Sequence, residues 1–283
     1  MPGLRIADRD RRLTPPPVTE AFEVVRGEVT LRGEATGEGE PVVLLHGLTA
    51  TRRYVVHGSR AIERAGRRVV TYDARGHGVS SPADPGAYDY GELAADALAV
   101  LDHLGIERAA LVGQSMGSAT AISVALGHPE RVRSLAIVTP AHRGHPSTNL
   151  DHWDALAEGL ETGGPEGFLA ALGPMHVGER WRVAVRTVIL QRLGRHAHPG
   201  AVADALRGIP RSAAFDGLGA LERIAVPTIV VGSRDDVDPD HPLALAEEYV
   251  RRIPGARLTI EQPGESPLAW RGGALSKEIL PLL

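Results

Sequence analysis

The chain contains no cysteine among its 283 residues. Disulfide bonds and thiolate chemistry are therefore excluded, and we expect a cytoplasmic protein. The sequence also lacks any apolar run long enough for a membrane-spanning helix. Its first 17 residues are charged and rich in proline, without the apolar segment of a secretory signal.

An excess of positive charge is missing as well. The formal net charge is −4, so we expect no nucleic-acid partner and no membrane partner. Neither G-x-G-x-x-G after the first strand nor G-x-x-x-x-G-K-[ST] is present, and His196-x-His198 has no third ligand nearby. The sequence therefore predicts no cofactor and no metal. The expected partner is a small-molecule substrate, bound by a monomer or a homodimer.

The stretch from Leu111 to Ala119 combines an apolar run, the motif G-x-S-x-G and a helical run of small residues. Gly113, Ser115 and Gly117 form the motif. Between a strand and a helix, this pattern predicts a nucleophile elbow, in which the serine stands at the tip of a strained turn. The glycines let strand and helix approach without a Cβ clash. The alternative is an ordinary glycine-rich turn.

Strands and helices are expected to alternate on both sides of this motif. The predicted strands cover residues 21–25, 28–32, 41–45, 68–72, 109–112, 132–138, 226–231 and 257–261. The alternation breaks after residue 140, where only helical patches follow, at 150–160, 166–172, 179–193 and 201–206. A segment of this length is too long for an ordinary loop. We therefore expect an N-terminal tail over 1–20, an α/β core over 21–140 and 216–283, and a helical cap over 141–215.

Four motifs occur in an order that resembles the α/β-hydrolase fold family. They are His46-Gly47 after the third strand, Asp73-x-Arg75-Gly76-His77-Gly78-x-Ser80, the elbow from Gly113 to Gly117, and Gly232-x-x-Asp235-x-x-x-Pro239. The resemblance implies an α/β fold with a mostly parallel central sheet, helices on both sides and a helical cap insertion.

The resemblance also implies roles for individual residues. Ser115 corresponds to the nucleophile, and the amides of Met116 and Leu48 correspond to the oxyanion hole. Asp235 stands where the family carries the acid of its triad, and Asp236 is the alternative. A turn or helix-capping role for Asp235 stays open.

The base position departs from the family pattern. The family usually has G-H-S-P after the last strand, whereas this chain has Gly264-Glu265-Ser266-Pro267 and no histidine beyond His241. One hypothesis is that Glu265, with a pKa raised by burial and by Asp235, acts as the base. The alternative is a surface turn residue in a protein that has lost triad chemistry.

A displaced histidine is another possible base. His142 follows a strand whose carboxyl end opens on the site in this fold. Three further histidines, His145, His152 and His176, lie in the expected cap, although each can equally be a surface residue. Structural positions are expected for His46, His77 and His128.

The sequence therefore predicts a hydrolase that acts on a small, largely apolar ester or lactone through Ser115, with Glu265 in the base position. Because function depends on the site and not on the scaffold, two alternatives remain. One is lyase, isomerase or cyclase chemistry in the same pocket. The other is a hydrolase scaffold that binds a small ligand without turning it over.

Overall fold

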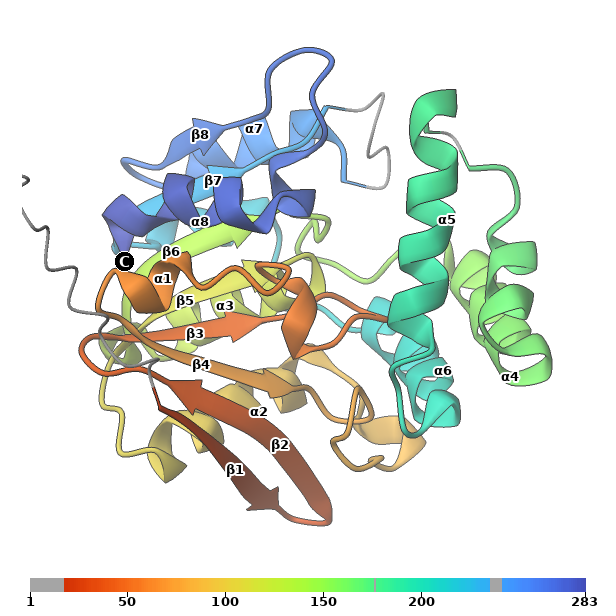
Figure 1. The fold of residues 1–283 in the computed structure, drawn as a ribbon, viewed down its shortest axis with the longest axis horizontal. Helices are drawn as coiled ribbons and strands as arrows, with labels where there is room; N and C mark the ends of the chain where they lie inside the picture. The colour runs from red at the N-terminus through yellow and green to blue at the C-terminus, as the bar shows by residue number, and fades with distance from the viewer. Residues whose placement is uncertain (1–17, 176, 235–240) are drawn as a thin grey trace, which may run out of the picture.

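The computed structural model describes residues 18–175, 177–234 and 241–283. A central sheet is covered by helices on both faces, and further helices stand beyond the carboxyl ends of its parallel strands (Figure 1). The strands are β1 Thr19–Arg26, β2 Val29–Thr36, β3 Pro41–Leu45, β4 Arg68–Asp73, β5 Ala109–Gln114, β6 Val132–Val138, β7 Thr228–Val231 and β8 Arg257–Thr259. The α-helices are α1 Ala61–Arg64, α2 Tyr90–His103, α3 Met116–Gly127, α4 Leu150–Leu172, α5 Glu179–Leu193, α6 Pro199–Gly208, α7 Leu243–Arg252 and α8 Gly272–Ile279. This arrangement confirms the predicted α/β-hydrolase fold.

The sheet has the order β1-β2-β4-β3-β5-β6-β7-β8. Strand β2 runs antiparallel to β1 and β4, and the remaining pairs are parallel. After β3 the chain moves to one side to form β4, and then returns to the other side to form β5. Ligands bind in open α/β sheets where the direction of winding reverses in this way, outside the carboxyl ends of the strands. His46 and Ser115 directly follow the two strands at this point.

Two hydrophobic cores follow from the alternation of side chains along the buried strands. In β3, Val43 and Leu45 belong to the core under α2, α3 and α7, whereas Val42 and Leu44 belong to the core under α1 and α8. Strand β3 is therefore apolar on both faces. Because both of its faces are buried, residues 41–45 form the continuous apolar run that predicted a buried strand.

The segment between β6 and β7 carries α4, α5 and α6, which we call the helical insertion. These helices share a core of their own, formed by Leu156, Leu160, Phe168, Leu193, Val202 and Leu206 among others. The two patches predicted at 150–160 and 166–172 are one element, α4, interrupted at Gly164, where φ is +59°. In the described part of the chain, no helix is long and apolar enough to cross a membrane.

His142 holds the two ends of the helical insertion together. Its ring lies 4.9 Å from the ring of Tyr90 and 5.1 Å from that of Phe215. Its Nε2 accepts a hydrogen bond of 3.0 Å from the amide of Ala214, and the hydroxyl of Tyr249 donates to its carbonyl oxygen at 2.6 Å. Burial, with a smaller contribution from His145, lowers the pKa of His142 to about 4. The imidazole is therefore neutral in the folded protein at pH 7.

The close approach of β5, α3 and the end of β3 fixes the turn at Ser115. A Cβ atom on Gly113 would lie 2.1 Å from the carbonyl oxygen of Gly117, and one on Gly117 would lie 2.1 Å from that of Leu45. Only glycine fits at either position. Ser115 itself has φ +51° and ψ −112°, a conformation that L-residues rarely adopt, so the packing of its neighbours must hold it there.

This packing predicts that Gly117→Ala destabilises the fold by at least about 3 kcal/mol or prevents folding, because the new methyl group would overlap backbone that cannot move aside. Gly127→Ala, at the end of the same helix and with no atom near its added Cβ, is the matched control. We expect it to raise stability by about 0.5–1 kcal/mol. Urea unfolding measures both. Equal stabilities for the two variants would contradict the packing argument.

The lowered pKa of His142 predicts that the protein loses stability in mild acid. The unfolded chain binds a proton near pH 6.5 and the folded chain only near pH 4, so the unfolded state gains protons first as the pH falls between these values. His142→Gln keeps an acceptor but does not titrate. It should lower stability at pH 7 and reduce the loss between pH 7 and pH 5 by at most about 2 kcal/mol. Urea unfolding measures the stability of both proteins. Equal losses of stability between pH 7 and pH 5 would contradict the lowered pKa of His142.

Candidate functional site

Ser115 carries a histidine partner. Nε2 of His241 lies 2.9 Å from Oγ of Ser115. A serine hydroxyl is a poor nucleophile until a base removes its proton, and an imidazole at this distance can do so because its pKa lies near neutrality. The pair therefore has the geometry of an activated nucleophile.

His241 lies in the connection between β7 and α7, two residues before α7 begins. Parallel strands β5, β6 and β7 end at the same edge of the sheet, so this connection comes close to the elbow after β5. The sequence motifs pointed to Glu265, and to histidines at or after residue 142 in the expected cap, so His241 was not predicted as the base. The available clue was that the last histidine of the chain follows a predicted strand and comes six residues after Asp235 in the sequence.

Glu265, the predicted base, lies elsewhere. Its amide donates to the carbonyl oxygen of Gln262 in a turn, and its carboxylate accepts a hydrogen bond of 3.0 Å from the guanidinium of Arg271. The side chain is 47% exposed and does not line the cavity that contains Ser115. The structure thus brings His241, and not Glu265, to the nucleophile. These contacts of Glu265 agree with the alternative in which it is a surface turn residue.

The segment after β3 lies directly against the elbow. A Cβ atom on Gly47 would stand 3.4 Å from Cβ of Ser115. The amide of Leu48 directly follows Gly47 in the chain, and the amide of Met116 directly follows Ser115. Neither amide donates a hydrogen bond to another group in the described part of the chain. Two unused donors beside a nucleophile are what an oxyanion hole requires.

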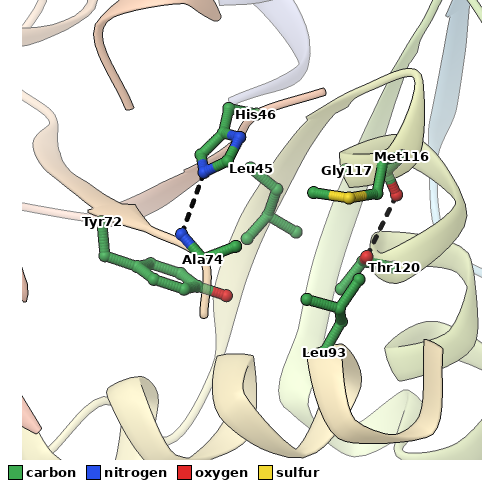
Figure 2. A pocket seen from close by; sticks show the side chains of 8 residues that line it. All are labelled: Leu45, His46, Tyr72, Ala74, Leu93, Met116, Gly117 and Thr120. Carbon is green, nitrogen blue, oxygen red and sulfur yellow. Dashed lines mark hydrogen bonds between the residues drawn. The ribbon is translucent and has the colours of Figure 1, made fainter. Parts of the chain in front are cut away.

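His46, which Figure 2 shows bonded to the amide of Ala74, also contacts the peptide group that contains the amide of Leu48. Its Nε2 accepts a hydrogen bond of 2.9 Å from the amide of Ala74, so the ring proton is on Nδ1, which lies 2.9 Å from the carbonyl oxygen of Gly47. That oxygen accepts a second hydrogen bond from the amide of Ala50. The carbonyl of Gly47 and the N–H of Leu48 belong to one planar trans peptide group and point in opposite directions. The two hydrogen bonds to the carbonyl oxygen therefore also orient the N–H of Leu48, on the side away from His46 and Ala50. Burial lowers the pKa of His46, which keeps the ring neutral.

Two cavities border this region. The smaller one, of about 10 Å³, lies behind the elbow among Leu45, Tyr72, Met116 and Thr120 and has room for about one water molecule (Figure 2). The larger one, of about 380 Å³, contains Ser115 and His241 and has the size of a small-molecule site.

The walls of the larger cavity are mainly apolar and come largely from the helical insertion. Residues of α4, α5 and α6 form one side, and the segment after β3 forms another. The apolar lining residues include Leu48, Tyr54, Trp153, Leu156, Phe168, Leu172, Ile189, Leu206 and Trp270. A few polar side chains, among them His57, Asn149 and Arg192, interrupt this lining. Such a site would take a small, largely apolar molecule.

The remaining predicted residues take several different positions. His152 lines the larger cavity, whereas His145 is exposed and His142 makes the contacts described above. His77 is buried, with Nδ1 lying 2.9 Å from the carbonyl oxygen of Arg75, and His128 is an exposed residue near Glu130. Asp235, Asp236 and His176 lie outside the described residues. Across the three described ranges, no three His, Cys, Asp or Glu side chains gather in a way that would hold a metal ion.

The comparisons with known proteins agree with this geometry. The family model of the alpha/beta hydrolase fold matches residues 40–267. A protein of Azorhizobium caulinodans named as the carbamate hydrolase RutD is 30% identical over 234 residues, which cover 82% of this chain and 86% of that protein.

Two solved structures illustrate the likeness in three dimensions. A thermophilic esterase from Thermogutta terrifontis is 26% identical, with a TM-score of 0.71, over 85% of this chain and 89% of that chain. An enol-lactonase from Burkholderia xenovorans is 24% identical, with a TM-score of 0.76, over 92% and 99% of the two chains, and it supports the fold alone. The match of the family model over most of the chain, together with the elbow and its histidine, shows that this protein belongs to the alpha/beta hydrolase fold family.

Proposed function

We propose that this protein hydrolyses small, largely apolar carboxylic esters or lactones. The observation that carries the proposal is the contact of 2.9 Å between Nε2 of His241 and Oγ of Ser115, at the tip of a strained elbow. The apolar lining of the adjoining cavity supports the substrate class. The esterase similar to this chain is named for the same class of reaction.

The proposed reaction has two halves. His241 takes the proton of Ser115 while Oγ attacks the carbonyl carbon, and the amides of Leu48 and Met116 donate to the oxyanion that forms. The C–O bond of the ester then breaks, and His241 returns the proton to the leaving alcohol. Water attacks the acyl-enzyme in the same way, releases the carboxylic acid and restores Ser115. We propose Asp235, with Asp236 as the alternative, as the acid that orients His241.

The alternatives have less support. Non-hydrolytic chemistry is an alternative because the usual position lacks a histidine, but His241 supplies an imidazole from another loop. A ligand-binding protein without turnover needs no aligned base, whereas this site has an imidazole in contact with its serine. The name of the relative from Azorhizobium caulinodans extends the substrates worth testing to carbamates, which present a similar carbonyl group.

We expect the wild-type protein to turn over short-chain p-nitrophenyl esters. His241→Ala should lower kcat/KM by about 10³-fold or more, because the proton of Ser115 then has no acceptor. Glu265→Gln should change it by less than about twofold, and Ser115→Ala is the inactive reference. A loss in the Glu265 variant equal to that in the His241 variant would contradict the proposal. No turnover by the wild-type protein would favour the ligand-binding alternative.

The cavity walls predict a change in acyl-chain preference. Trp153 of α4 is among the largest side chains that line the cavity, so Trp153→Ala should shift the preferred acyl chain to greater length and raise KM for the acetyl ester several-fold. Val183→Ala, in the same insertion but 78% exposed, serves as the control. The measurement is kcat/KM for p-nitrophenyl esters from acetyl to decanoyl. An unchanged chain-length profile in the Trp153 variant would exclude this wall from acyl binding.

A further inference from the structure

His196 connects the helical insertion to two loops of the core, those that follow β3 and β4. It lies between α5 and α6 and is half-buried. The amide of Gly78 donates to its Nδ1 at 2.8 Å, so the ring proton is on Nε2. Nε2 lies 3.0 Å from the carbonyl oxygen of Thr49 and donates to it. The next residue, Ala197, adds a hydrogen bond from its amide to the carbonyl oxygen of Gly78 at 2.8 Å.

Thr49 belongs to the segment that carries the predicted oxyanion donor. It directly follows Leu48 and has φ +65°, which is unusual for a β-branched residue. A backbone in this conformation persists only when its surroundings hold it. His46 holds the segment from the side of β3, through the carbonyl oxygen of Gly47. His196 holds it at a second point, through the carbonyl oxygen of Thr49.

His77 fills the space between these two histidines. Its ring centre lies 5.2 Å from that of His46 and 5.6 Å from that of His196. Burial lowers the pKa of His196 to about 4, so its ring is neutral at pH 7 and keeps both its acceptor and its donor. The hydrogen bonds to Gly78 and Thr49 need this neutral form, because a protonated Nδ1 could not accept from the amide of Gly78.

We propose that His196 is a positioning residue for the oxyanion hole. Through its hydrogen bond to Thr49, it fixes the segment from Gly47 to Ala50 so that the amide of Leu48 stays aimed at the oxyanion. The helical insertion then contributes to the rate of the reaction as well as to the shape of the cavity. This inference rests on the proposed hydrolysis through Ser115.

Two substitutions separate the two contacts of the ring. The side-chain amide of His196→Gln reaches about as far as Nε2 and can still donate to Thr49. The shorter amide of His196→Asn reaches about as far as Nδ1, so it can accept from Gly78 but cannot reach Thr49. Both variants remove the ring packing, so a purely structural role would affect them alike. His198→Asn, an exposed residue in the same loop, is the control.

We expect His196→Asn to lower kcat for p-nitrophenyl esters about tenfold or more with KM changed by less than about twofold, because the loosened donor acts mainly in the transition state. His196→Gln should stay within about threefold of the wild type. Hydrogen exchange of the amides in residues 46–51, followed by mass spectrometry, should accelerate about tenfold in the Asn variant and little in the Gln variant. Equal effects of the two variants on kcat and on exchange would overturn the proposal.

Two measurements keep this test independent of turnover and of folding. If the wild-type protein shows no esterase activity, the proposed hydrolysis fails, while the exchange comparison still decides whether His196 holds the segment. If the Asn variant does not fold, nitrogen-15 NMR of the wild-type protein shows which ring nitrogen of His196 carries the proton. A proton on Nε2 supports the contact with Thr49, and a proton on Nδ1 overturns it.

Discussion

The site depends on one backbone constraint, the turn that holds Ser115 at φ +51°. This conformation is costly for serine, and it persists because β5, α3 and the end of β3 approach too closely for any side chain on Gly113 or Gly117. The turn places Ser115 in contact with His241 at the larger cavity, and the amide of Met116 directly follows it in the chain. The proposed nucleophile and the proposed oxyanion donor at Met116 thus share a single structural cause.

The proposed second donor, the amide of Leu48, lies in a segment that two neutral histidines contact. His46 and His196 each accept a hydrogen bond from a backbone amide with one nitrogen and donate to a carbonyl oxygen with the other. Such an arrangement requires an uncharged ring, and burial lowers the pKa of both groups enough to provide it. Imidazole is suited to this task because one rigid ring bridges two loops. The same side chain serves a different purpose at His241, where it contacts Ser115.

Local patterns were sufficient to predict much of the protein. The elbow, the segment after β3 and the buried strands each depend on residues close together in the sequence, so the motifs predicted the fold and placed Ser115, Met116 and Leu48 correctly relative to the sheet. The base could not be predicted in this way. Its position depends on which of several loops at the carboxyl edge of the sheet reaches Ser115, and that is decided by packing between distant segments.

The failure at Glu265 illustrates the limit. Gly264, Ser266 and Pro267 matched the family pattern so closely that the residue between them was expected to face the nucleophile. In the structure that residue lies in an exposed turn and pairs with Arg271, while His241 approaches from the preceding loop. Similarly, the sequence shows His196 only as half of a His-x-His pair without a third metal ligand, because nothing in it indicates that this loop folds back onto Gly78 and Thr49.

The central claim is that His241 activates Ser115, and the rate of covalent labelling by a fluorophosphonate tests it most directly. Labelling requires the activated hydroxyl but no substrate, so it does not depend on knowing the natural ester. We expect rapid modification of Ser115, located by peptide mapping, in the wild-type protein and in Glu265→Gln. Labelling of His241→Ala should be at least about 100-fold slower. Equally fast labelling of the His241 variant would show that His241 does not activate Ser115.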